Sequence, residues 1–124
     1  MFLDDLKAFL TEHSYTDITR DTMPDKPDEC IGLLLWDDVP GTVGSWRYVQ
    51  IQVRRIDGDD AYAAAYAIRQ LLDSEPDGQS QKRIQLTPDR WCIAKPRRGP
   101  KKLSADNRGT VYYIEVALWG DNKP

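Results

Sequence analysis

The fold is decided by residues 46–72, which read WRYVQIQVRRIDGDDAYAAAYAIRQLL. The first part of this stretch alternates between apolar and polar residues, with Val49, Ile51 and Val53 on one face. That period of two predicts a half-buried strand. The second part, residues 61–72, changes period and places alanine, isoleucine and leucine side chains along one side of a helix.

A short acidic segment, residues 57–60, separates this strand from the helix. Asp57 suits the N-cap position, and Asp59 and Asp60 favour the first helical turn, where negative charge is stabilised. The same segment does not fit a calcium loop, because it lacks the alternating oxygen ligands and the closing glutamate. A strand that leads through a short acidic turn into a helix predicts an α+β protein.

The remaining apolar patterns predict a second helix and three more strands. In chain order these segments are the helix 2–10 and the strands 30–36, 91–94 and 111–119. Residues 16–22 are expected to be a short extended piece, and residues 84–86 a minor strand. Residues 37–45 and 96–107 contain proline and glycine, so we expect both to be loops.

The predicted order is helix, two strands, helix, two strands, and short connections favour antiparallel neighbours. We therefore expect one domain, residues 1–124, of the α+β class. It would contain a single antiparallel or mixed sheet of about four strands with two helices packed on one face. The predicted core is Val49, Ile51, Val53, Ile68, Leu71, Leu72, Ile114, Val116 and Leu118.

The charge of the chain is unevenly distributed, although its formal net value is only −3. Up to Asp60 there are 13 acidic residues against six basic ones, whereas residues 82–108 carry nine bases and two acids. Such asymmetry allows contacts between copies of the same protein, or contact with a polyanion. No apolar run approaches the roughly 20 residues of a membrane span, and no signal peptide is apparent, so we expect a soluble protein without a membrane partner.

The search for catalytic or metal-binding motifs finds little. His13 is the single histidine and has no cysteine or acid at ligand spacing, so we predict neither a metal site nor another cofactor. Cys30 and Cys92 lie in apolar runs and are expected to be free buried thiols, although a disulfide between strands remains an alternative. Residues 41–45 read GTVGS but lack the lysine and flanking elements of a phosphate loop.

Residues 95–102 form the sharpest local feature, a predicted loop that reads KPRRGPKK. Its five basic residues are Lys95, Arg97, Arg98, Lys101 and Lys102. They repel one another unless a partner neutralises them, and the partner is either an acidic protein surface or a nucleic-acid backbone. A solvated, mobile loop is the third interpretation. No aromatic residue is interleaved with these bases in the sequence, which argues against stacking on a single strand.

The order and spacing of these segments resemble the minor capsid and tail terminator proteins of tailed bacteriophages and prophages. The resemblance is carried by YVQIQVRR at residues 48–55 and by the alanine-rich helix that ends IRQLLD at residue 73. It extends to the short first helix, the proline-containing loop 23–28, the apolar strand 30–36, and the DNRG turn at 106–109 before the long last strand. It covers nearly the whole chain.

The resemblance implies a structural virion protein without enzymatic activity, present in the host cytoplasm during assembly. In that family the subunits form a ring, usually a hexamer, that caps the tail tube and presents the head–tail joining surface. The implied partners are other copies of the chain, the major tail tube protein, the head connector protein and passing DNA. On this reading the basic residues at 95–102 project from the ring, and Asp37, Asp38, Asp59 and Asp60 meet them on a neighbouring subunit.

Two other classes of function stay open at this stage. The first is a nucleic-acid-binding module that uses the basic segment, and it predicts affinity for DNA that falls steeply with salt. The second is a small enzyme with a cysteine nucleophile, which would need Cys30 or Cys92 beside His13.

Overall fold

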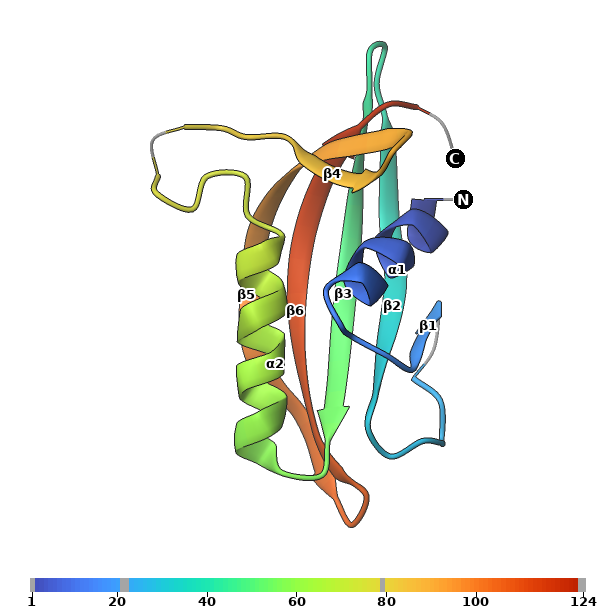
Figure 1. The fold of residues 1–124 in the computed structure, drawn as a ribbon, viewed down its shortest axis with the longest axis vertical. Helices are drawn as coiled ribbons and strands as arrows, with labels where there is room; N and C mark the ends of the chain where they lie inside the picture. The colour runs from blue at the N-terminus through green and yellow to red at the C-terminus, as the bar shows by residue number, and fades with distance from the viewer. Residues whose placement is uncertain (1, 21–22, 79, 123–124) are drawn as a thin grey trace.

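The computed structural model describes residues 2–20, 23–78 and 80–122. It contains two helices and six strands (Figure 1). The helices are α1 (Phe2–Glu12) and α2 (Gly58–Leu71). The strands are β1 (Ile18–Arg20), β2 (Cys30–Pro40), β3 (Ser45–Arg55), β4 (Ile84–Thr87), β5 (Arg90–Asp106) and β6 (Gly109–Gly120).

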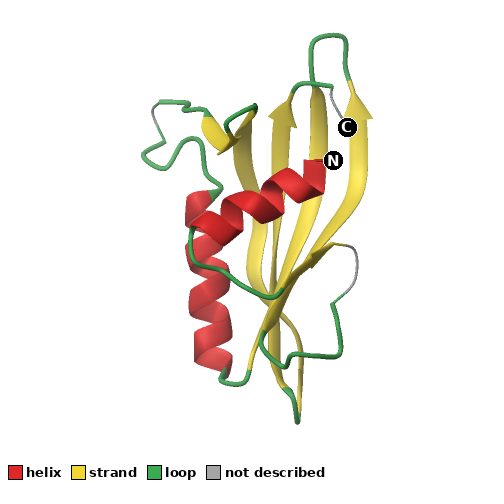
Figure 2. Cartoon of the chain, turned by 45° about the vertical axis from the view of Figure 1, so that its right-hand side comes forward, coloured by secondary structure: helices red, strands yellow, loops and turns green. Residues whose placement is uncertain are grey.

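The six strands form one mixed sheet in the order β1-β2-β3-β6-β5-β4. Only β1 and β2 are parallel, and every other neighbouring pair is antiparallel. The sheet curves into a half-barrel around the helices (Figure 2). The predicted four-stranded sheet was therefore wrong. The two additional strands, β1 and β4, lie where a short extended piece and a minor strand were expected, but with three and four residues they were not counted in the sheet.

Both helices lie on the same side of this curved sheet (Figures 1 and 2). One continuous core of buried side chains lies between the helices and the strands. Leu6 and Leu10 of α1 and Ile68 of α2 are completely buried there. The strands contribute the alternate residues Val49, Ile51, Val53, Ile114, Val116 and Leu118. Within the described residues, neither helix is long and apolar enough to cross a membrane.

The strand and helix of the opening stretch lie where their periods predict them. The predicted strand becomes β3, and the helix begins slightly earlier than its apolar pattern, at Gly58. The Asp57 side chain accepts a hydrogen bond from the backbone N–H of Asp59 at 2.8 Å. This bond satisfies one of the donors left free at a helix start, so Asp57 is the N-cap.

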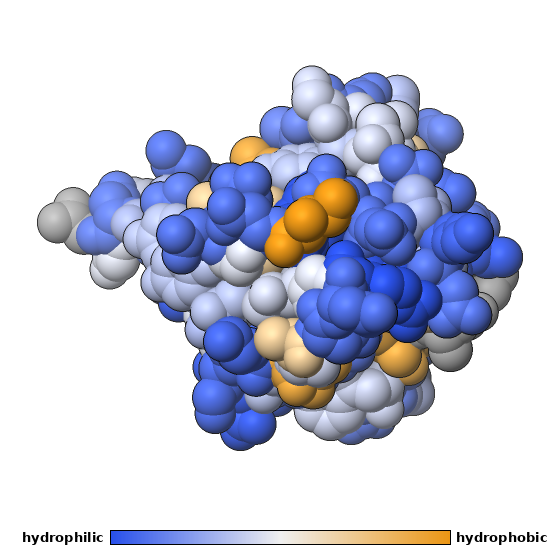
Figure 3. Space-filling view, turned by 90° about the horizontal axis from the view of Figure 1, so that it is seen from below, coloured by the Kyte–Doolittle hydropathy of each residue, from blue (hydrophilic) through white to orange (hydrophobic). Residues whose placement is uncertain are grey.

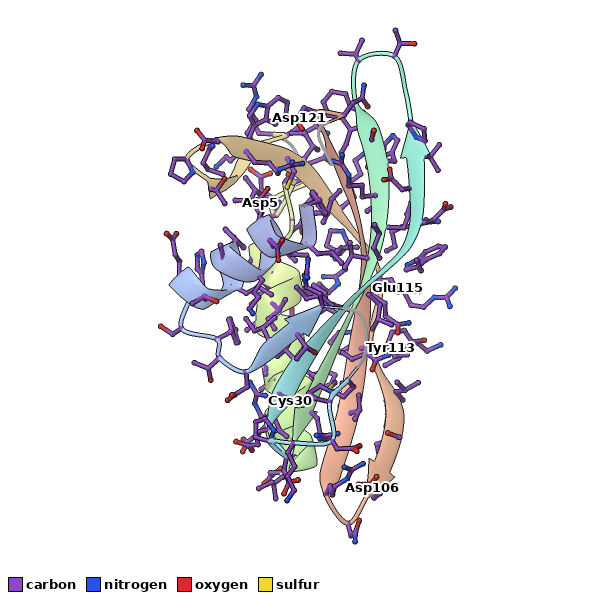
Figure 4. The ribbon with its side chains drawn as sticks, turned by 90° about the vertical axis from the view of Figure 1, so that its right-hand side faces the viewer. Asp5, Cys30, Asp106, Tyr113, Glu115 and Asp121 are labelled. Carbon is purple, nitrogen blue, oxygen red and sulfur yellow. The ribbon has the colours of Figure 1, made fainter. Side chains whose placement is uncertain are left out.

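A buried arginine fixes α1 and the end of the chain against the sheet. Arg90 lies 2.6 Å from Asp5 of α1 and 3.4 Å from Asp121, and its side chain is 6% exposed. Two guanidinium groups contact the Phe2 ring, with Cζ of Arg47 4.7 Å and Cζ of Arg90 5.5 Å from its centroid. Figure 4 shows Asp5 and Asp121 at the same end of the molecule. These contacts determine where α1 crosses the sheet.

Two strands extend much further than their sequences predict. β2 continues beyond Trp36 to Pro40 through a register shift between Leu35 and Asp37, so only residues 41–44 connect it to β3. β5 continues from the apolar residues 91–94 through the whole basic segment to Asp106. In both cases an antiparallel neighbour, β3 or β6, supplies the pairing that carries the strand past its prolines.

Candidate interaction surface

The basic segment is part of a strand. Residues 95–102 lie in the middle of β5 and pair with β6, which corrects the prediction of a loop. The pairing shifts register three times, between Pro96 and Arg98, between Arg98 and Lys101, and between Lys102 and Ser104. Gly99, with φ of +89°, allows the middle shift, because a side chain there would collide with the backbone of Tyr113.

This part of β5 lies at an open edge of the sheet. On the side of β5 away from β6, β4 pairs only with residues 90–92, and the backbone of Ala94 bonds to Ser74. Residues 95–106 extend beyond both of these contacts, so that side of the strand is open. At the opposite side, β1 pairs only with residues 31–33 of β2, and residues 34–40 extend beyond it. Prolines, bulges and lysines on β5 are features that discourage another strand from pairing with its backbone.

The basic side chains of β5 fall into two groups. Arg97 lies over the ring of Tyr48, with Cζ 5.0 Å from the centroid, and Arg98 forms an ion pair with Glu115 at 3.3 Å. Lys101 and Lys102 lie further along the strand, opposite Tyr113 and Tyr112, and are exposed. Figure 4 shows Glu115 and Tyr113 on the side of the sheet away from both helices.

All four tryptophans of the chain lie on the side of the sheet that the helices leave uncovered. On β3 and β6 they alternate with the buried residues of the core, and Trp46 pairs directly with Trp119. Ring centroids are 5.4 Å apart for Trp36 and Tyr48 and 6.0 Å apart for Trp91 and Trp119. We call Trp36, Trp46, Tyr48, Trp91 and Trp119 the outer aromatic face.

The outer aromatic face overturns one argument from the sequence. Aromatic residues do interleave with the bases of β5, but they come from neighbouring strands and from positions far apart in the chain. Arg83 lies over Trp91, with Cζ 4.0 Å from the ring centroid, in the same way as Arg97 lies over Tyr48. The signal in the sequence is the alternation of Trp46 and Tyr48 with the apolar residues that follow, which by itself predicts only a strand.

Three adjoining hollows follow the outer aromatic face. One, of about 330 Å³, is lined by Trp46, Tyr48 and Lys95 among others. A second, of about 180 Å³, shares Trp46 and Lys95 with it, and a third, of about 220 Å³, shares Arg97. Because consecutive hollows have lining residues in common, they form one shallow groove, which follows the direction of the strands from Trp119 through Ala117 to Glu115 of β6.

The four predicted acidic site residues do not lie together. Asp37 and Asp38 are exposed near the far end of β2, whereas Asp59 and Asp60 are exposed in the first turn of α2, at the opposite end of the long axis (Figure 1). Asp38 lies 4.0 Å from Nε of the buried Arg47. Burial lowers the pKa of Arg47, and the charge of Asp38 opposes this shift.

The acidic end of β2 and the basic part of β5 occupy opposite edges of the sheet. The register runs from Asp37 through Tyr48 and Ala117 to Lys95, so these residues lie in one row across four strands. At the usual spacing of neighbouring strands the two edges are about 14 Å apart. Asp59 and Asp60 lie in the first turn of α2, at the end of the molecule that faces the viewer in Figure 3. The surface of that end is mostly hydrophilic, with only small separated hydrophobic spots.

The two cysteines are free and buried, as predicted. Burial raises the pKa of both thiols, that of Cys92 to about 12, so very little reactive thiolate forms near neutral pH. The His13 ring packs on Phe9 and bonds through Nδ1 to the Phe9 carbonyl oxygen at 2.9 Å. Within the described residues, no group of three or more metal-ligating side chains forms a site.

The described residues thus form a sheet with two charged edges and an outer face that carries aromatic and basic side chains. The sequence model of the bacteriophage tail terminator protein family matches residues 6–114. The chain therefore belongs to the family of bacteriophage tail terminator proteins, which confirms the resemblance seen in its sequence. A comparison with curated proteins gave no match.

Proposed function

We propose that this tail terminator assembles head to tail into a closed ring, a hexamer by analogy with its family, through contact between the two charged edges of its sheet. The ring caps the tail tube and carries the head–tail joining surface, with the major tail tube protein and the head connector protein as partners. Assembly takes place in the host cytoplasm, and the finished ring is part of the virion, where DNA passes through it.

The observation that carries this proposal is the opposite charge of the two open edges. Asp37 and Asp38 lie on the β2 edge, and Lys101 and Lys102 lie on the β5 edge. A contact between two different surfaces of the same chain is heterologous, and such contacts close into a ring when the rotation between subunits fits. Each subunit would then use both edges once.

The directions of the strands agree with this arrangement. The two edges belong to β2 and β5, with β3 and β6 between them. In the order β2, β3, β6, β5, each strand is antiparallel to the next. Strands β2 and β5 therefore run in opposite directions, so neighbouring subunits in a ring present antiparallel edges. Lys101 lies in the row of Tyr113, Gln52 and Gly32, four residues along β3 from the row of Asp37, so the strands are inclined to the ring axis when these charges meet. Because Pro96 and Pro100 lack backbone donors, we expect side-chain charges to make most of the contact.

Charge reversal tests the proposal. We expect Asp37→Lys, or Lys101→Glu with Lys102→Glu, to raise the concentration of half-assembly at least about tenfold, because like charges then face each other. Combining the two reversals in one chain restores the opposite signs and should recover most of the assembly. Light scattering over a concentration series measures the mass of the oligomer, and Lys7→Glu on the exposed side of α1 is the matched control.

Three outcomes would overturn the edge contact. The first is a wild-type protein that stays monomeric both alone and with purified tail tubes. The second is a combined variant that assembles no better than either single reversal. The third is loss of assembly in Asp60→Lys with normal assembly in Asp37→Lys, which would place the acidic contact at the start of α2.

A further inference from the structure

The outer aromatic face has the composition of a protein-binding surface. Tryptophan, tyrosine and arginine are the residues that most often dominate binding energy at such surfaces. Here four tryptophans, Tyr48 and Arg97 gather on one side of a single sheet. Trp36, the largest type of side chain, remains 52% exposed. A cluster of this kind on the surface of one protein marks a contact site.

The charge around the groove selects the chemistry of the occupant. Among the side chains that line its three hollows, Lys95, Arg97 and Arg98 are basic and Glu115 is the acid. Glu115 already forms an ion pair with Arg98. The groove is thus left with an excess of positive charge beside apolar rings, which suits carboxylates interspersed with apolar side chains.

At Tyr48 and Trp91 the positions of the guanidinium groups favour a peptide over a single-stranded nucleic acid. A base that stacks on an aromatic side chain needs a free ring face. Arg97 already covers a face of Tyr48, and Arg83 covers a face of Trp91. Carboxylates can reach these guanidinium groups from outside without displacing them, since arginine retains donors in the plane of the group.

The direction of the face distinguishes its partner from a second copy of the chain. The face points away from the helices, roughly perpendicular to the two edges, and a ring closed through the edges leaves it uncovered (Figure 4). This step rests on the proposed ring. On the same side of the sheet, at the end of β3 away from Trp46, the loop before β2 lies against the strand. Arg54 donates hydrogen bonds there to the carbonyl oxygens of Pro24, Pro27 and Asp28 at 2.6–2.9 Å.

We propose that the outer aromatic face docks an acidic, extended segment of a second, different virion protein. Glutamate or aspartate side chains of that segment pair with Lys95, Arg97 and Arg98, and its apolar side chains rest against Trp36 and Trp46. The succession of the three hollows along β5 and β6 accommodates an extended chain that lies along the strands.

The test uses the full chain and a short glutamate-rich peptide with interspersed leucines. Intrinsic fluorescence is a direct readout, because every tryptophan of the protein lies on the proposed site. We expect saturable binding that weakens with salt, and a loss of affinity of at least about tenfold in Trp36→Ala and in Arg97→Gln. Tyr66→Ala on α2 and Lys7→Gln on α1 are matched controls on the helical side and should bind as the wild type does.

Each of the following results would contradict the proposal. Equal binding by all four variants would show that the peptide binds elsewhere, and a lysine-rich peptide that binds as well would remove the charge argument. Tighter binding of an oligothymidylate than of the acidic peptide would assign the face to single-stranded nucleic acid. Failure of the ring is distinguishable from failure of the docking site, because Lys101→Glu with Lys102→Glu alters oligomer mass and should leave peptide binding unchanged.

Discussion

The two faces of the sheet are made by the same strands and yet differ in almost every property. On the covered side, Ile51 and Ile114 are completely buried beneath the helices. On the uncovered side, one residue away along each strand, Gln50 and Glu115 are partly exposed. Alternation along a strand thus gives one set of residues to the core and the next set to the surface. Large aromatic residues on the second set therefore need an explanation other than folding.

The largest expected difference between the faces is in stability. We predict that Ile51→Ala lowers the free energy of unfolding by about 2–5 kcal/mol, because it removes buried apolar volume and leaves a cavity. Its neighbour Gln50 is the matched control, and Gln50→Ala should cost less than about 1 kcal/mol. Urea denaturation measures both. Equal losses would contradict the assignment of one core to one face.

A second difference should appear in alkali, because Cys92 lies on the covered side. Burial raises its pKa from 9.0 to about 12, so the folded state keeps the thiol protonated after the unfolded state has ionised. Its contribution to stability is complete below pH 9 and is lost as the pH rises from 9 towards 12, by roughly 1.4 kcal/mol per pH unit.

The measurement for Cys92 is the slope of stability against pH, compared between the wild type and Cys92→Ala. The variant loses packing at every pH, but the alkaline part of its curve should be flatter. Tyr15, whose pKa burial also raises, titrates in both proteins and cancels in the comparison. Identical alkaline slopes would show that the Cys92 thiol is not held neutral by the fold.

The smallest expected effect concerns the most exposed tryptophan. Trp36→Ala should change the free energy of unfolding by about 1 kcal/mol or less, since the residue is 52% exposed and its ring contact is with Tyr48. Thermal unfolding of the two proteins measures this difference. A loss as large as that of Ile51→Ala would make Trp36 a structural residue and weaken its role in docking.

The sequence predicts local elements of this fold better than their assembly. Residues 46–72 are predictable because an eleven-residue strand and a fourteen-residue helix each repeat their period several times. For β1 the sequence predicts an extended piece, but its parallel pairing with β2, which makes it part of the sheet, is encoded by no local pattern. The basic segment of β5 contains two prolines and a glycine, and its strand depends on pairing with β6.

The candidate surface was predicted in part for the same reason. The basic and acidic residues are predicted to make contacts from charge alone, and their role stays a prediction. The outer aromatic face joins β2, β3, β5 and β6, so no single window of sequence contains it. Proximity between Arg97 and Tyr48, almost fifty positions apart, follows from the order of strands in the sheet. Strand order is the information that residue periodicity lacks.

Arg90 has a practical consequence for tracing this protein in a larger particle. By holding Asp5 and Asp121 together, it brings the beginning and the end of the described chain to one pole of an elongated molecule. A reporter fused to either terminus will mark that same pole. Labels at both ends should coincide in electron micrographs, and a third label in the 107–108 turn should appear at the opposite pole, giving the polarity of each subunit directly.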